Sequence, residues 1–154
     1  MYRVMVALLM VVFPACFVIV DHAMHPGVPL IVFVGKWYVF WAAGIRLLSA
    51  GLMQQFRPDF TARRIFNFSS DEALPVIREL GIANFATGVL GIASLAAETF
   101  VLPVAIWAGI FYGAATLGHL RAPDRSANEV FAMITDLLAF VVFGAVVASE
   151  FLAH

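Results

Sequence analysis

The sequence contains a single cysteine, Cys16, which excludes an intrachain disulfide. Charged residues are also scarce, at 12% of the chain against about 25% in soluble domains. The net charge of -1 and the absence of a basic tract give no indication of a nucleic-acid partner. The sequence also lacks a glycine-rich phosphate loop, CxxC pairs, an HExxH motif and a nucleophile elbow. We therefore expect a protein that is not an enzyme.

The apolar content of the chain points to lipid as its solvent. Hydrophobic residues make up 63% of the 154 residues, and the mean hydropathy is +0.97. So small a body cannot hide this much apolar surface in its interior. We predict an all-α integral membrane helical bundle that forms a single transmembrane domain over residues 1–154.

Segments of about 20 apolar residues are needed to cross a bilayer, and five segments approach that length. They are residues 2–20, 30–55, 77–97, 101–120 and 128–151. Lys36 interrupts the second, so residues 26–35 have three interpretations: membrane-inserted, interfacial or re-entrant. We expect four core transmembrane helices and an added N-terminal transmembrane helix.

The positions of the basic residues predict the orientation, because Lys and Arg accumulate in cytoplasmic loops. With five spans, one side of the membrane holds nearly all loop arginines, namely Arg3, Arg57, Arg63, Arg64, Arg121 and Arg125. The opposite side holds only Lys36. This distribution predicts a multi-pass protein of the cytoplasmic (inner) membrane, with its N-terminus in the cytoplasm and His154 outside.

Glycines mark the faces where membrane helices approach closely. The predicted helix-packing glycines of the third and fourth spans are Gly81, Gly88, Gly91, Gly109 and Gly113. Since these two spans are joined by a very short loop, we expect them to form a hairpin in which the glycine faces meet. A seam between copies of the chain is the alternative.

Polar side chains inside the apolar segments form the candidate site. They are Arg46, Glu79, Asn84, His119 and Asp136. An ionised group at mid-membrane costs at least about 2.5–3.5 kcal/mol, so we expect Arg46 to pair with Asp136, and Glu79 with His119. These pairs are either structural or line a polar pocket open to the cytoplasm.

Three further residues, Asp21, His22 and His25, have a spacing compatible with metal binding. A solvated loop explains this spacing more simply. We therefore predict no metal site.

Several segments beyond Gly35 resemble a bacterial membrane-protein family of unknown function. They are residues 35–51, Ser70 to Pro75, Arg78 to Phe85, Phe111 to Gly113, and Gly118-His119. More distantly, Glu79 at the start of a glycine-rich span is similar to the corresponding helix of DoxX-like proteins, which have four membrane helices. Some of those are described as subunits of quinone-linked sulfur oxidation, and the resemblance extends only to Glu79 and the glycines near it.

The first functional expectation is a non-catalytic accessory subunit or a small-molecule-binding protein with a buried polar cluster. A small-solute transporter or channel and a DoxX-like quinone-linked redox subunit are the alternatives. We expect no cofactor, although the redox alternative would require quinone or haem. The expected partners are membrane lipid and either a larger membrane complex or a homo-oligomer.

Overall fold

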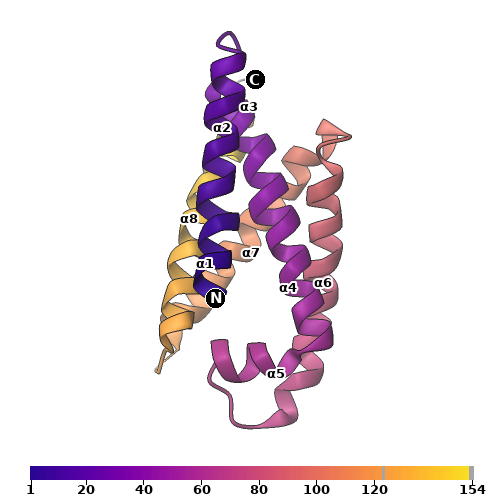
Figure 1. Cartoon of the computed structure of the whole chain (residues 1–154), viewed down its shortest axis with the longest axis vertical. Helices are drawn as coiled ribbons and strands as arrows, with labels where there is room; N and C mark the ends of the chain where they lie inside the picture. The colour runs from indigo at the N-terminus through magenta and orange to yellow at the C-terminus, as the bar shows by residue number, and fades with distance from the viewer. Residues whose placement is uncertain (123, 153–154) are drawn as a thin grey trace.

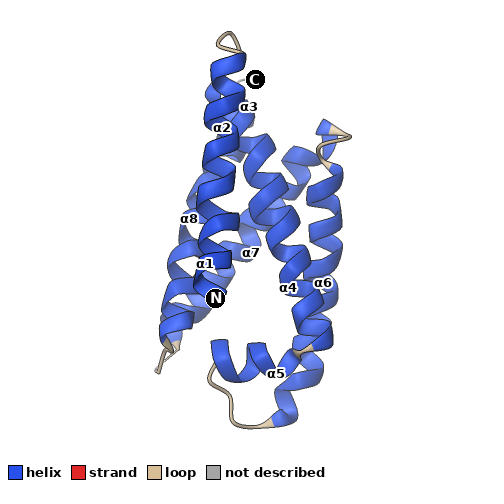
Figure 2. Ribbon diagram, viewed as in Figure 1, coloured by secondary structure: helices blue, strands red, loops and turns tan. Residues whose placement is uncertain are grey.

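The computed structural model describes residues 1–122 and 124–152, and these residues form helices and loops without any strand (Figure 2). Five helices are long and apolar enough to cross a membrane. They cover Tyr2–Met24, Leu30–Phe56, Asp71–Ala93, Glu98–Arg121 and Ala127–Leu152. The predicted set of five long apolar helices is confirmed. The prediction for His154 falls outside the described residues.

Shorter elements subdivide these long helices. In chain order they are α1 (Tyr2–Ala7), η1 (Leu8–Val12), α2 (Phe13–Met24), α3 (Leu30–Tyr38), η2 (Val39–Ile45), α4 (Arg46–Phe56), α5 (Pro58–Phe60), η3 (Thr61–Ile65), η4 (Asp71–Ala73), α6 (Leu74–Ala93), η5 (Glu98–Phe100), α7 (Val101–Arg121) and α8 (Ala127–Leu152). The segments η1, η2 and η3 are π-helical, and η4 and η5 are 3-10 turns. Because α3 runs through η2 into α4, a re-entrant segment over residues 26–35 is wrong: residues 25–29 form a loop and Leu30 starts the second long helix.

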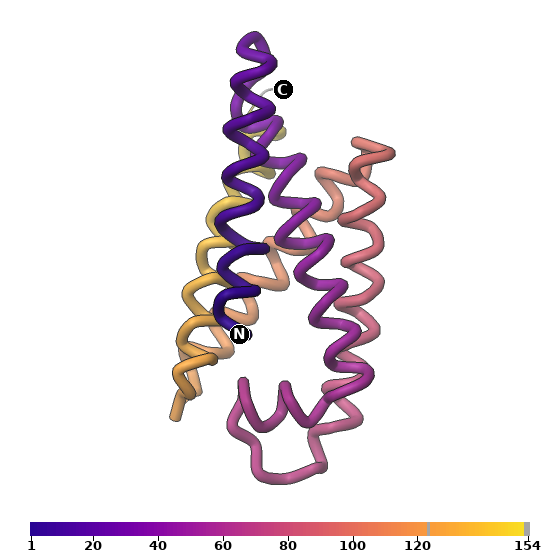
Figure 3. Tube along the Cα trace, viewed as in Figure 1, coloured from indigo at the N-terminus to yellow at the C-terminus, as the bar shows by residue number. Residues whose placement is uncertain are grey.

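Two helix pairs dominate the packing (Figure 1). One pair is α7 with α8, and the other is α4 with α6. The first long helix lies along α3 and α8, whereas the consecutive helices α6 and α7 contact each other much less. The trace in Figure 3 shows the same separation, with α6 following α4 on one side and α8 lying on the other.

The glycines of α6 contact the second long helix rather than α7. A Cβ added at Gly88 would lie 2.4 Å from the backbone nitrogen of Leu48, and one added at Gly91 would lie 2.6 Å from Gly44. Gly81 faces the same helix, near Gly51. The predicted contact between the glycine faces of the third and fourth spans is therefore wrong.

The glycines of α7 face α8. A Cβ at Gly109 would meet Phe143 at 3.4 Å, and one at Gly113 would meet the ring of Phe140 at 2.7 Å. Each glycine-bearing helix thus packs against a different neighbour. These two contacts explain why the chain divides into two helix pairs.

The core between the pairs is apolar and includes the first helix. Val6, Met10, Val39 and Phe143 are at most 1% exposed and belong to one buried cluster, which we call the apolar cluster. We expected the first helix to be an addition to a four-helix core. Its side chains Val6 and Met10 are instead part of that core.

The arginine-rich segments meet at one end of the bundle. Arg3 donates to Asn128 at 2.9 Å, and the Asn128 amide donates to the carbonyl oxygen of Arg64 at 3.4 Å. These bonds join the N-terminus, the segment after α5 and the start of α8, which all lie at the lower end in Figure 1. Lys36 lies toward the other end, where it donates to Asp21 at 2.8 Å. We call the end of the bundle that holds Arg3 and Arg64 the arginine end.

Candidate functional site

Three buried ionisable side chains meet around His119, near the arginine end. Its Nδ1 lies 3.0 Å from Oε1 of Glu129, and its Nε2 lies 3.8 Å from Oδ2 of Asp136. The three side chains are only 8%, 3% and 12% exposed, respectively. A histidine thus sits between two carboxyl groups with little access to water, an arrangement that we call the His119 trio.

The geometry of α8 places both carboxyl groups toward α7. Glu129 and Asp136 are seven residues apart, which is about two helical turns, so they share one face. The start of α8 is fixed by Ser126, whose hydroxyl accepts the backbone N–H of Glu129 at 3.0 Å and donates to the carbonyl oxygen of Ile65 at 3.1 Å. The first turn of α8 is therefore tied to the segment that follows α5.

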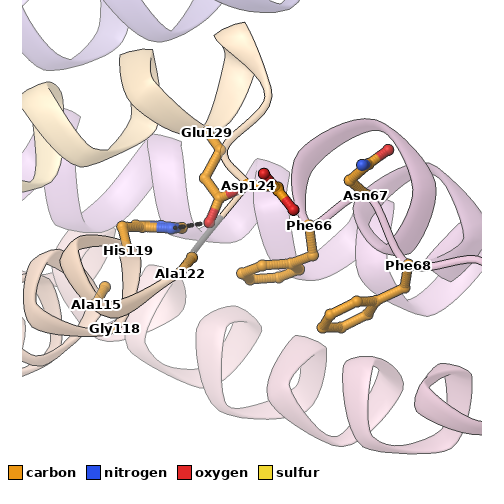
Figure 4. Close-up of a pocket in the computed structure, with 9 residues that line it drawn as sticks. All are labelled: Phe66, Asn67, Phe68, Ala115, Gly118, His119, Ala122, Asp124 and Glu129. Carbon is orange, nitrogen blue, oxygen red and sulfur yellow. Dashed lines mark hydrogen bonds and ion pairs between the residues drawn. The ribbon is translucent and has the colours of Figure 1, made fainter.

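A pocket of about 550 Å³ opens beside the trio (Figure 4). The residues that line it are Phe66, Asn67, Phe68, Ala115, Gly118, His119, Ala122, Asp124 and Glu129. The Phe66 ring stacks on Phe68 at 5.5 Å and on His119 at 5.8 Å. The pocket therefore has a wall of three nearly parallel rings and a carboxyl group at its buried edge.

Arg46 does not form the ion pair that the sequence predicted. Arg46 and Asp136 are close enough to interact electrostatically, but no pair of their charged atoms lies within 4.0 Å, and His119 is the ion-pair partner of Asp136. The buried Nε of Arg46 has no hydrogen-bond partner among the described residues. Arg46 extends the polar region from the His119 trio toward the centre of the bundle.

A second polar contact lies within the apolar cluster, to which Tyr112 and Ala42 belong. The hydroxyl of Tyr112 is buried and donates to the carbonyl oxygen of Ala42 at 2.6 Å. Ala42 lies one helical turn from Arg46 in the second long helix. The polar region therefore ends near Tyr112, where the Phe143 ring stacks against it at 6.2 Å.

Glu79 and Asn84 lie apart from this region. Glu79 is exposed, and the buried Asn84 donates to Oε1 of Gln54 at 2.8 Å. The predicted Glu79–His119 pair is wrong, because α6 packs on α4 and not on α7. Of the predicted cluster, the structure brings His119 and Asp136 into contact and leaves Arg46 nearby.

The sequence prediction named only His119 among the residues that line the pocket, and it missed Glu129 and Phe66. Glu129 stands near the start of a predicted span, where a carboxyl group is usually solvated, although its seven-residue distance from Asp136 indicated a shared face. Phe66 lies in a loop, where no helical period predicts the direction of a side chain. The contact between Ser126 and Ile65 that brings this loop to α8 links residues far apart in the chain.

A separate network lies at the opposite end. Asp21 is buried and accepts hydrogen bonds from Lys36 at 2.8 Å and from the indole of Trp37 at 2.9 Å. Within residues 1–122 and 124–152, no group of three His, Cys, Asp or Glu side chains is arranged to hold a metal ion. Asp21, whose spacing from His22 and His25 was compatible with metal binding, is thus engaged in a structural network.

Comparison with known proteins assigns no activity to the chain. The model of DUF6790, described as a family of unknown function, matches residues 2–150. No curated protein and no solved structure matches the chain. The match includes the first helix, and it supports neither the expected likeness to DoxX-like proteins nor a bacterial origin.

Proposed function

Because the chain belongs to the DUF6790 family, whose function is unknown, we propose a function from its site alone. The protein is a multi-span membrane protein that binds a small molecule in the pocket beside the His119 trio and has no catalytic chemistry of its own. It resides in the cytoplasmic membrane with the arginine end inside, in line with the bias of arginine toward cytoplasmic loops. The single observation that carries the proposal is a pocket of about 550 Å³ bordered by a buried carboxyl–imidazole pair.

The cost of burying the trio supports a functional role. Ionisable side chains within apolar helices are expensive and tend to mark binding or transport sites. The pocket volume also falls in the range of about 300–1,000 Å³ that small-molecule sites occupy. A purely structural pair would not need an open pocket beside it.

The apolar cluster favours binding over conduction. Along the first long helix, Val6 and Met10 lie between Tyr2 and Asp21. Along the second, Val39, Ala42 and Ala43 lie between Lys36 and Arg46, and along α8 Phe143 follows Asp136. A channel for a polar solute would need polar groups or water at the depth where the apolar cluster lies. We therefore rank the transporter or channel second.

The remaining alternatives concern partners and cofactors. An accessory subunit of a larger membrane complex is compatible with the same pocket, since such a subunit can present a bound molecule to its partner. A quinone-linked redox subunit would carry quinone or haem, which an absorption spectrum of purified protein would reveal. We propose that membrane lipid surrounds the chain and that no resident cofactor is required.

Filling the pocket tests the proposal. Gly118 lines the pocket, and a Cβ added there meets nothing within 4 Å, so Gly118→Leu is expected to take up part of the pocket volume. After purification in mild detergent, extraction and mass spectrometry should show a small molecule enriched with the original chain and reduced at least about tenfold in the variant, equivalent to about 1.4 kcal/mol of binding.

Gly144→Leu is the matched control. Gly144 is also a helical glycine with nothing within 4 Å of an added Cβ, but it lies away from the pocket. This variant should retain the small molecule at the original level. Equal occupancy in the two variants, or no enriched molecule at all, would contradict the proposed function.

A further inference from the structure

The pocket is acidic although it lies at the arginine end. Its charged lining residues are Asp124 and Glu129, with His119 as the one group able to carry positive charge, and the described lining includes no Arg or Lys. With both carboxyl groups ionised, the lining stays negative whether or not His119 holds a proton. A ligand with a positive charge would therefore find a complementary site.

Three arginines at this end contact groups outside the pocket. Arg63 forms an ion pair with Asp71 at 2.7 Å, and Arg3 donates to Asn128 at 2.9 Å. Arg125 contacts the Sδ atom of Met133 at 3.6 Å rather than Asp124 next to it in the chain. These contacts leave the carboxyl groups of the pocket without a basic partner other than His119.

Glu129 retains an acceptor for a ligand. Its Oε1 faces His119 at 3.0 Å, while its second oxygen makes no hydrogen bond to any of the described residues. Figure 4 shows this carboxyl group at the side of the pocket that the Phe66 ring also borders. A donor or a positive charge placed over the ring would lie near that oxygen.

The ring wall favours the same kind of ligand. The faces of aromatic rings are electron-rich and attract cations. Phe66 and Phe68 are stacked with an interplanar angle of 17°, and both line the pocket, so they give it an apolar surface. An apolar body can pack on this surface while its charged group reaches the carboxyl groups.

We infer that the pocket binds an organic cation, an ammonium group attached to an apolar body, with Glu129 and Asp124 as counter-charges and Phe66 and Phe68 as the packing surface. This inference rests on the proposed small-molecule binding. Two sources offer this chemistry: a free organic amine, and the ammonium head group of a membrane lipid.

The test compares three probes of one shape. Benzyltrimethylammonium is a cation, neopentylbenzene is its neutral carbon analogue, and benzylsulfonate is an anion. Equilibrium binding is measured on the full chain in nanodiscs, with empty nanodiscs subtracted. The cation should bind at least about tenfold more tightly than either other probe.

Variants assign the preference to the acidic residues. Glu129→Gln keeps an acceptor for His119 but removes the charge, and it should weaken cation binding about tenfold or more while leaving the neutral probe unchanged. Asp124 is exposed, so Asp124→Asn provides a second variant if the change at the buried Glu129 impairs folding. Asp124→Asn should weaken cation binding several-fold. Glu79→Gln removes an exposed carboxylate outside the pocket and should have no effect.

The outcomes separate this inference from the proposed function. Equal binding of the cation and its neutral analogue, or tighter binding of the anion, would overturn the cation inference and leave small-molecule binding in place. Binding of none of the probes, together with no effect of Gly118→Leu on copurified molecules, would overturn both. Weaker binding of the probe in phosphatidylcholine nanodiscs than in nanodiscs of an uncharged glycolipid, which has no ammonium group, identifies a lipid head group as the source, and equal binding identifies a free amine.

Discussion

Replacing His119 with leucine is expected to lower the free energy of unfolding by about 3–5 kcal/mol. The change leaves the carboxyl group of Glu129, which is 3% exposed, without its partner, and it also removes the neighbour of Asp136. A buried charge that loses its partner must stay unpaired or take up a proton, and either outcome disfavours the folded state. Unfolding in mixed micelles with increasing SDS would measure the effect.

Two further variants control this result. Asp71→Asn breaks the exposed Arg63–Asp71 pair and should cost less than about 1 kcal/mol. Replacing both His119 and Glu129 with leucine should cost less than His119→Leu alone, because removing both members of a buried pair leaves fewer polar groups without a partner. A His119→Leu protein as stable as the Asp71→Asn protein would show that the trio contributes little to folding.

Adding one methyl group at Gly88 is expected to destabilise the bundle by about 1–3 kcal/mol. The new Cβ would stand 2.4 Å from the backbone nitrogen of Leu48 and 2.6 Å from its Cα. Since these are backbone atoms of a facing helix, no side-chain rotation can relieve the contact and α4 must move away from α6. The midpoint of thermal unfolding in detergent would report the loss for Gly88→Ala.

Gly144→Ala serves as the comparison. A Cβ at Gly144 meets nothing within 4 Å, and alanine in a helix interior is favoured over glycine by about 0.5–1 kcal/mol. This variant should therefore be as stable as the original chain or slightly more stable. If the two alanine variants unfolded at the same temperature, the close contact between α4 and α6 would be in doubt.

The long helices could be predicted from the sequence because their signal is local. About 20 apolar residues suffice to identify each helix. The arginines in the loops indicate which helix ends lie on the same side of the membrane. The choice of packing partner is different, because Gly88 offers a close approach to any neighbouring helix. Only the three-dimensional arrangement decides that Leu48 fills that place and that no residue of α7 does.

The candidate site was predictable in part for a similar reason. His119 and Asp136 stand out because each interrupts an apolar segment, whereas Glu129 follows a loop and looks like an ordinary helix start. Glu79 also interrupts an apolar segment, yet it faces outward. Polarity within a span therefore identifies candidates, but the face of the helix and the identity of its neighbour decide which of them meet.

The π-helical segment η2 joins the two halves of the second long helix, α3 and α4. Lys36 and Trp37 precede it and reach Asp21, whereas Arg46 follows it on the side of Asp136. Loss or gain of one residue there would rotate one half against the other by about 100°, so both polar networks would not form in the same molecule. An in-frame codon deletion within this stretch should therefore separate the two networks even where each remaining side chain is unchanged.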